Sequence, residues 1–361
     1  MPAGVPAGPA RPTTGLRPGL TPARPAVAPA RPGLTPARPG VAPARPGIAP
    51  SRPPAPSTMA SVRLGTRVGS GKWSYEPVPD WGRGAGPGSV PEFGTVSGIA
   101  CDSKDNVYVF QRTIEPCVLV FSPDGRLLRK FGGDTFRNPH GIWIGPDATR
   151  RGEEVALLTD RDLHQVVKYT LEGRKLATWG AAYREPGDAG QPFNQPARAT
   201  LGPRGEMYVA DGYGQYRVHQ FSPEGELVHS WGKRGKGPGE FGWPVHHALL
   251  DPRGRLIVSD RGNNRLQLFS PRGKYQGEWT DLDMPQDYVI TRENEIMLCE
   301  GNAKRIAVLD LDGAVLARWG EGGNRPGQFA ASPHSIWVDS RGDIYVGEVI
   351  DPNRLTKFVR R

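Results

Sequence analysis

The chain has little of what marks disulfide-rich, membrane-spanning or helical proteins. It contains only three cysteines, Cys101, Cys117 and Cys299, and no Cys-x-x-Cys motif, so neither a disulfide framework nor a cysteine-based zinc site is indicated. No apolar run is long enough to span a membrane, and no apolar stretch near the start is typical of a secretory signal. Long segments with apolar residues at helical spacing are also missing. We therefore predict an all-β protein in the cytoplasm.

Acidic residues are absent from residues 1–60, which form a compositional class of their own. An Arg-Pro pair recurs there every seven residues, in a background of Ala, Pro, Gly, Val and Leu, at Arg17, Arg24, Arg31, Arg38, Arg45 and Arg52. Proline at this density removes backbone donors and favours extended conformers, so we predict a disordered, low-complexity tail. The tail is either a passive spacer or a weakly basic arm for anionic partners, and Met59 is an alternative start of the chain.

From residue 61 onward, a segment of about 40 to 50 residues recurs, which is typical of propellers and solenoids. Within each copy, short alternating or β-branched runs are separated by Gly, Pro, Asp and Asn, which predicts a four-stranded antiparallel blade. The copies share an ending in which an aromatic residue precedes a small one: Phe131-Gly132, Trp179-Gly180, Trp231-Gly232, Trp279-Thr280 and Trp319-Gly320.

The sixth copy stops early, because the chain ends just after its third strand, Leu355 to Val359. Residues Trp73 to Gly82 carry the same Trp-Gly ending with no strands before them, so we expect this segment to pair with the carboxy-terminal strands. Such pairing would close a ring and leave no blade with an unpaired edge. We predict a six-bladed β-propeller over residues 61–361, closed by an amino-terminal strand.

Three histidines occupy one equivalent position in alternate repeats. Counting back from the turn that ends each innermost strand gives six slots: Ser97, His140, Ala197, His246, Gln286 and His334. A lone histidine here would be a polar group capping a strand in a wet channel, but alternate slots in a six-membered ring converge on one axis. Three neutral imidazoles leave a coordination position open, which is typical of catalytic zinc. We predict Zn²⁺ at His140, His246 and His334, with His247 as an alternative ligand.

The turns and several motifs also resemble known families. Gly-Pro-Gly-Glu-Phe at 237–241 and Pro-Gly-Gln-Phe at 326–329 are similar to the turns of NHL repeats. More narrowly, most of residues 90–361 resembles the catalytic core of peptidyl-α-hydroxyglycine α-amidating lyase (peptidylamidoglycolate lyase), and the motifs that carry this resemblance are 107–112, 138–142, 163–166, 211–213 and 333–334.

The resemblance implies a zinc-dependent carbon–nitrogen lyase that splits R-CO-NH-CH(OH)-COOH into an amide and glyoxylate. On the matching positions, the three slot histidines would hold zinc, Arg112 would orient the substrate, and Tyr213 would act as the base. A guanidinium fork suits a carboxylate and also stabilises a nearby phenolate. Two structural alternatives remain open: Arg112 fills a slot that Arg161 and Arg261 fill in other repeats, and the ring of Tyr213 would also pack over the channel rim.

Three departures from the lyase pattern alter these expectations. Ser335 stands where the family has an acidic residue that helps to hold calcium, so we do not expect calcium here unless backbone oxygens near Ile142 supply the ligands. Ser332 replaces a methionine two residues before the last histidine, and Gly214 replaces a disulfide cysteine after the tyrosine. The substrate pocket is therefore changed, and the substrate is a peptide or a small molecule.

Two other functions remain open on the sequence. One is a non-catalytic NHL propeller that binds protein or nucleic acid on its face. The other is a metal-dependent propeller lyase or lactonase acting on a cyclic ester. For partners, we predict a monomer with a small-molecule or peptide substrate, no membrane contact, and nucleic-acid contact only weakly through the basic tail.

Overall fold

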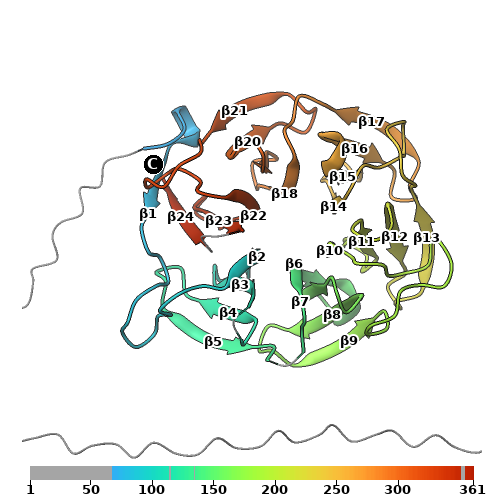
Figure 1. The fold of residues 1–361 in the computed structure, drawn as a ribbon, viewed down its shortest axis with the longest axis horizontal. Helices are drawn as coiled ribbons and strands as arrows, with labels where there is room; N and C mark the ends of the chain where they lie inside the picture. Colours follow the sequence, from blue (N-terminus) through green and yellow to red (C-terminus); the bar gives the residue numbers. More distant parts are fainter. Residues whose placement is uncertain (1–66, 114, 134, 351–353) are drawn as a thin grey trace, which may run out of the picture. The chain divides into compact units, whose positions relative to one another are not determined.

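The computed structural model describes residues 67–113, 115–133, 135–350 and 354–361 (Figure 1). These residues form 24 strands and three short 3-10 helices, η1 (Gly71–Trp73), η2 (Ala148–Arg150) and η3 (Arg261–Asn263). Within them, no helix is long and apolar enough to cross a membrane. The predictions for residues 1–60 lie outside the described residues.

The strands form six four-stranded antiparallel sheets arranged as blades around a channel, which confirms the predicted propeller (Figure 1). From the channel outward, blades 1 to 3 are β2 (Thr95–Cys101), β3 (Val107–Arg112), β4 (Val118–Phe121) and β5 (Leu127–Phe131); β6 (Pro139–Asp147), β7 (Glu153–Asp160), β8 (Gln165–Thr170) and β9 (Lys175–Trp179); and β10 (Arg198–Leu201), β11 (Met207–Asp211), β12 (Arg217–Phe221) and β13 (Leu227–Trp231).

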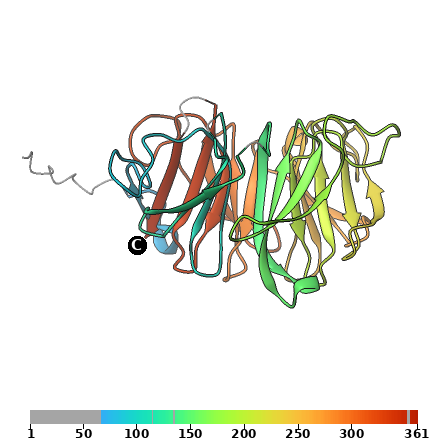
Figure 2. The same ribbon diagram turned by 90° about the horizontal axis from the view of Figure 1, so that it is seen from below.

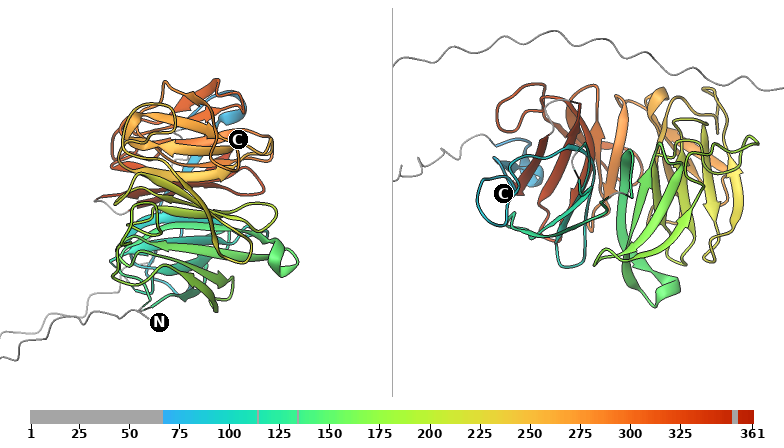
Figure 3. Two further views of the ribbon diagram at one scale, coloured as in Figure 1. Left: turned by 90° about the vertical axis from the view of Figure 1, so that its right-hand side faces the viewer. Right: turned by 60° about the horizontal axis from the view of Figure 1, so that its bottom comes forward.

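Blades 4 to 6 follow the same order. They are β14 (Val245–Leu250), β15 (Leu256–Asp260), β16 (Arg265–Phe269) and β17 (Tyr275–Trp279); β18 (Pro285–Ile290), β19 (Ile296–Glu300), β20 (Arg305–Leu309) and β21 (Val315–Trp319); and β22 (Ser332–Val338), β23 (Ile344–Val349) and β24 (Arg354–Arg360), with β1 (Tyr75–Val78) outermost. Figures 2 and 3 show the blades from the side, with their strands running between the two faces of the ring.

The ring is closed by β1, as the Trp-Gly ending before the first repeat predicted. β1 pairs antiparallel with β24, with Tyr75 opposite Arg360 and Val78 opposite Lys357. The buried ring of Tyr75 lies 5.4 Å from that of Trp319, so the clasp also packs against blade 5. The strand is shorter than the predicted segment, because Asp80 takes a left-handed φ of 54° that ends extended backbone.

One hydrogen bond recurs in all six blades and fixes the loops that lead into the channel. Its acceptor is a side chain near the end of the second strand, and its donor is a backbone N–H of the loop before the innermost strand. Asp160, for example, accepts from Asn138 at 2.8 Å, and Glu348 accepts from Ala331 at 2.8 Å. The six residues are Gln111, Asp160, Asp211, Asp260, Glu300 and Glu348, all buried. Satisfying these donors inside the protein holds each loop in one conformation.

Candidate metal centre

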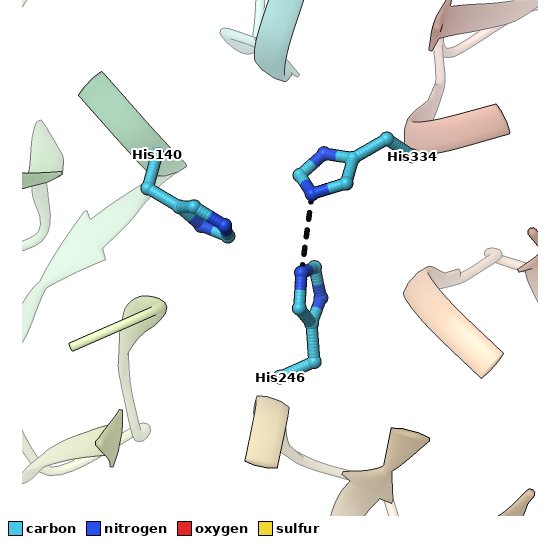
Figure 4. A group of neighbouring side chains, drawn as sticks. All are labelled: His140, His246 and His334. Carbon is cyan, nitrogen blue, oxygen red and sulfur yellow. Dashed lines mark hydrogen bonds between the residues drawn. The ribbon is translucent and has the colours of Figure 1, made fainter. Parts of the chain in front are cut away.

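His140, His246 and His334 come from the innermost strands of blades 2, 4 and 6 and meet in the channel (Figure 4). All three are buried, at 1%, 3% and 3% exposure. One ligand atom from each lies within 4.8 Å of the others, and this is the single group of three or more potential metal ligands found among the described residues. The alternation of histidine slots in the sequence therefore corresponds to convergence in space.

A β-bulge turns each of these side chains toward the channel. The pairing register shifts between Pro139 and Ile142 in β6, between Val245 and His247 in β14, and between Pro333 and Ser335 in β22. In each strand the histidine falls within the bulge. A bulge residue is left out of the ladder and its side chain is re-aimed. The bulge thus directs the histidine into the channel. Regular alternation would have directed the same side chain to one face of the blade.

The Nδ1 atom of each histidine is held by the backbone of the next blade. His140 Nδ1 lies 2.8 Å from the carbonyl oxygen of Ala197, His246 Nδ1 lies 3.1 Å from that of Gln286, and His334 Nδ1 lies 3.0 Å from that of Ser97. These acceptors are the three slots without histidine. Because a carbonyl oxygen only accepts, each Nδ1 carries the proton and donates, so each Nε2 has a lone pair that can bind a metal, although that of His140 accepts the Tyr213 hydroxyl in this structure.

The arrangement of the Nε2 atoms fits a bound cation. His246 Nε2 and His334 Nε2 are 3.1 Å apart, yet with both protons on Nδ1 neither nitrogen has a hydrogen to give the other. Two such lone pairs repel unless a cation lies between them. Two imidazole ligands of a tetrahedral zinc ion would be separated by about 3.4 Å, given zinc–nitrogen bonds of about 2.0–2.1 Å. Three neutral imidazoles at this spacing could thus hold a metal ion.

The environment keeps these imidazoles neutral. Burial, followed by the neighbouring histidines, holds the pKa of His140 well below its usual range, and burial likewise lowers the pKa of His246. Burial and then the guanidinium groups of Arg112 and Arg261 lower the pKa of His334 to about 3. A neutral imidazole is the form that binds a metal, so near neutral pH the three histidines are in the form that can bind an ion.

Tyr213 lies beside the histidines, on the loop after β11. Its hydroxyl is 2.9 Å from His140 Nε2 and receives a longer contact, 3.4 Å, from Arg261 Nη1. Its backbone carbonyl accepts the indole N–H of Trp243 at 2.9 Å. Two residues earlier, Asp211 fixes the loop and is 3.0 Å from Nε2 of the buried His219. The ring of Tyr213 also packs against that of Trp243, with 5.5 Å between the ring centres, so the structure shows both a contact with His140 and packing at the rim.

Three arginines surround Tyr213, although the sequence pointed to only one of them. Arg112 donates through Nε to the carbonyl oxygen of Pro139 at 2.6 Å, and burial lowers the pKa of Arg112. The guanidinium of Arg161 stacks 5.1 Å from the ring centre of Tyr213, and Arg261 reaches its hydroxyl. The shared slot suggested repeat-structural arginines, but the loops bring all three to one place. One signal in the sequence could have shown that these arginines are not features of every repeat. In the other three blades, the equivalent position holds Gly212, Gly301 and Val349.

His247 does not join the histidine cluster. Its Nδ1 lies 2.9 Å from a carboxylate oxygen of Asp287, and the group of potential metal ligands among the described residues does not include it. Burial, followed by the guanidinium of Arg198, lowers the pKa of His247 to about 4. The interpretation of His247 as an alternative ligand is therefore not favoured by the geometry.

Sequence comparisons relate the chain to amidating enzymes and to NHL proteins, although no family model matches it. It is 33% identical over 224 residues to peptidyl-glycine alpha-amidating monooxygenase B of Xenopus laevis, covering 54% of this chain and 24% of that protein. It is 27% identical over 330 residues to peptidyl-alpha-hydroxyglycine alpha-amidating lyase 1 of Drosophila melanogaster, covering 77% and 59%. It is 33% identical over 229 residues to mouse NHL repeat-containing protein 3, covering 58% and 63%. The chain thus spans about a quarter of the length of the amidating monooxygenase it matches.

Solved structures support the fold alone. A gluconolactonase from Xanthomonas campestris superposes with a TM-score of 0.57 at 13% identity, covering 80% of this chain and 91% of that one. A streptogramin B lyase superposes with a TM-score of 0.53 at 12% identity, covering 74% and 94%. The chain is therefore a six-bladed propeller that is related in sequence to peptidyl-α-hydroxyglycine α-amidating lyases and to NHL repeat proteins.

Proposed function

We propose that this protein is a zinc-dependent lyase that cleaves the C–N bond of a carbinolamide, R-CO-NH-CH(OH)-COO⁻, to an amide and glyoxylate. The observation that carries the proposal is the contact of 2.9 Å between the Tyr213 hydroxyl and Nε2 of His140, which puts a proton-transfer group beside three metal-ready imidazoles. The named lyase relatives support the same reaction class.

In this proposal, His140, His246 and His334 hold the ion, which as a Lewis acid would make the substrate hydroxyl easier to deprotonate. The Nδ1–H donors to neighbouring carbonyls keep the three rings in place while the substrate binds. Because the three imidazoles are buried, the charge of a bound ion would be little screened by solvent.

Tyr213 is proposed to move the proton. As a phenolate it takes the proton of the substrate hydroxyl, the C–O bond becomes the carbonyl of glyoxylate, and the C–N bond breaks. The same proton then passes from the Tyr213 hydroxyl to the departing amide nitrogen, so atoms and charges balance. Arg161 over the ring and Arg261 at the hydroxyl stabilise the phenolate.

Arg112 is proposed to bind the substrate carboxylate. Its Nε is used by the carbonyl of Pro139, which fixes the direction of the guanidinium and leaves its two Nη groups for a bidentate partner. A carboxylate held there would orient the carbinol carbon toward Tyr213. Burial is the main cause that lowers the pKa of Arg112, because it takes the guanidinium out of water. A carboxylate partner would offset this loss of solvation.

The test begins with metal analysis of protein purified without a chelator or a metal-affinity tag. We expect near-stoichiometric zinc in the natural protein, its loss in a folded His140→Ala/His334→Ala variant, and its retention in His229→Ala, which changes an exposed histidine. With N-benzoyl-α-hydroxyglycine as the substrate, glyoxylate and benzamide should appear in equal amounts. Zinc-loaded protein that releases neither product would refute the lyase.

The relatives named NHL repeat-containing protein 3 favour a second candidate, a binding scaffold without catalysis. In that case, a protein or RNA partner would bind equally well to the His140→Ala/His334→Ala variant. The lactonase interpretation would call for carboxylate and amide ligands, of which the sequence shows no matching set. Within the described residues, the potential metal-binding group consists of histidines alone, so the geometry supports this interpretation least.

A further inference from the structure

A layer of buried charge lies next to the histidine layer in the channel. It is formed by the residues that directly follow the six slots: Gly98, Gly141, Arg198, His247, Asp287 and Ser335. Blades 1, 2 and 6 contribute small residues, whereas blades 3, 4 and 5 contribute the ionisable side chains of Arg198, His247 and Asp287, which we call the charged layer. Their exposures are 4%, 1% and 2%.

Asp287 is the centre of the charged layer. One of its carboxylate oxygens accepts a short hydrogen bond from Arg198 Nη1, and the other lies 2.9 Å from His247 Nδ1. Burial alone would raise the pKa of Asp287, but Arg198 and then His247 hold it below its usual range. The arginine crosses the channel past Gly141, where an added Cβ would lie 2.8 Å from Cβ and Cγ of Arg198. The glycine after His140 therefore makes room for this ion pair.

The charged layer is connected to all three slot histidines. Arg198 follows Ala197, whose carbonyl holds His140, and Asp287 follows Gln286, whose carbonyl holds His246. Asp287 also accepts from the backbone N–H of Ile336 at 3.4 Å, two residues after His334. The cavity between the layers has a volume of about 10 Å³, room for about one water. No bulk water separates the ion pair from the histidines.

We infer that Arg198 and Asp287 are positioning residues for the metal centre. Their ion pair sets the spacing of the three imidazoles. This inference rests on the proposed metal site but not on the lyase reaction. The pair contacts neither Tyr213 nor the three arginines around it, so its contribution is to metal affinity. Partners that orient metal ligands typically change metal affinity by about 10- to 100-fold when they are removed.

The test is zinc affinity, measured by competition with a chromogenic chelator. Removing one partner would leave a buried unpaired charge, so both are replaced at once in Arg198→Met/Asp287→Leu, a change that often preserves or raises stability. We expect zinc to bind about 10- to 100-fold more weakly to this variant, with the zinc-free protein still folded although the backbone N–H of Ile336 loses its acceptor. Natural zinc affinity in the folded variant would overturn the inference.

A matched control is the buried pair of Lys168 and Asp147, 2.8 Å apart and not in contact with the histidines. Lys168→Met/Asp147→Leu should leave zinc affinity unchanged, and an equal loss there would also overturn the inference. If the channel double variant does not fold, Arg198→Gln/Asp287→Asn decides, because it removes both charges and keeps polar side chains at both positions. Weaker zinc binding is expected, and unchanged binding would contradict the inference. A natural protein that binds zinc but lacks lyase activity refutes the proposed function alone, whereas one that binds no zinc refutes both.

Discussion

Acid should destabilise the zinc-free protein through its channel histidines, and His334 offers the cleanest measurement. Its pKa is lowered to about 3 in the folded protein, by burial and then by Arg112 and Arg261. In the unfolded chain, a histidine has a pKa of about 6.5. Between these two values, the unfolded chain binds a proton that the folded protein does not, so stability falls as the pH is lowered through this window.

The size of the effect follows from the two pKa values. Each pH unit inside the window costs about 1.4 kcal/mol per histidine, so His334 alone lowers the free energy of unfolding by about 2 kcal/mol between about pH 7 and about pH 5. Because the imidazole is only 3% exposed, solvent screening does not reduce this figure much. His140 and His246 act in the same direction.

The assay is urea unfolding of zinc-free natural protein and of His334→Gln at the two pH values. Comparing each protein with itself removes the packing cost of the substitution. We expect the loss of stability on acidification to be smaller in His334→Gln by about 2 kcal/mol. His229→Gln, at an exposed position on β13, serves as the control and should behave like the natural protein. An equal loss in the natural protein and His334→Gln would refute the reasoning about burial.

Three further changes test other parts of the molecule. Tyr213→Phe should lower kcat/KM for glyoxylate release by about 100-fold or more while zinc content stays the same, because only the proton-transfer group is lost. Gly141→Ala should lower the free energy of unfolding by about 1–3 kcal/mol in urea titrations, because the new Cβ would lie 2.6 Å from the carbonyl oxygen of Ala197. Tyr75→Ala should cost about 3–5 kcal/mol in the same measurement, because it empties the contact between the clasp and Trp319. A free energy of unfolding equal to that of the natural protein, in Gly141→Ala or in Tyr75→Ala, would contradict the contact on which that prediction rests.

The fold could be predicted because its signals are local and repeated. Trp179, Trp231, Trp279 and Trp319 end the outer strands at the predicted places, and β1 closes the ring as the spare Trp-Gly segment indicated. Six copies of one pattern correct each other's errors, so a weak signal in one blade is read from the others. The bounds of β1 were missed, since the left-handed turn at Asp80 has no clear mark in the sequence.

The site was only partly predictable, because it depends on contacts between blades. Equivalent slots identified His140, His246 and His334, but equivalence made Arg161 and Arg261 look like features of the repeat. What distinguishes them is loop conformation, which carries both guanidinium groups to Tyr213. The roles proposed for Arg112, Tyr213 and the histidines remain predictions, whereas the convergence of these residues is a feature of the structure.

The six slots also differ in what they present to the centre of the channel. Histidine slots supply imidazoles, while the intervening slots supply carbonyls and must keep their side chains out of the centre. Ser97 and Ala197 do so by being small, and Gln286 does so because its amide is held by Arg261 and by Ser332. Holding Gln286 fixes Arg261 beside Tyr213 at the same time. The guanidinium groups of Arg112, Arg161 and Arg261 lie on blades 1, 2 and 4, and their positive charge would attract an anionic group at the channel mouth to that side of the histidines.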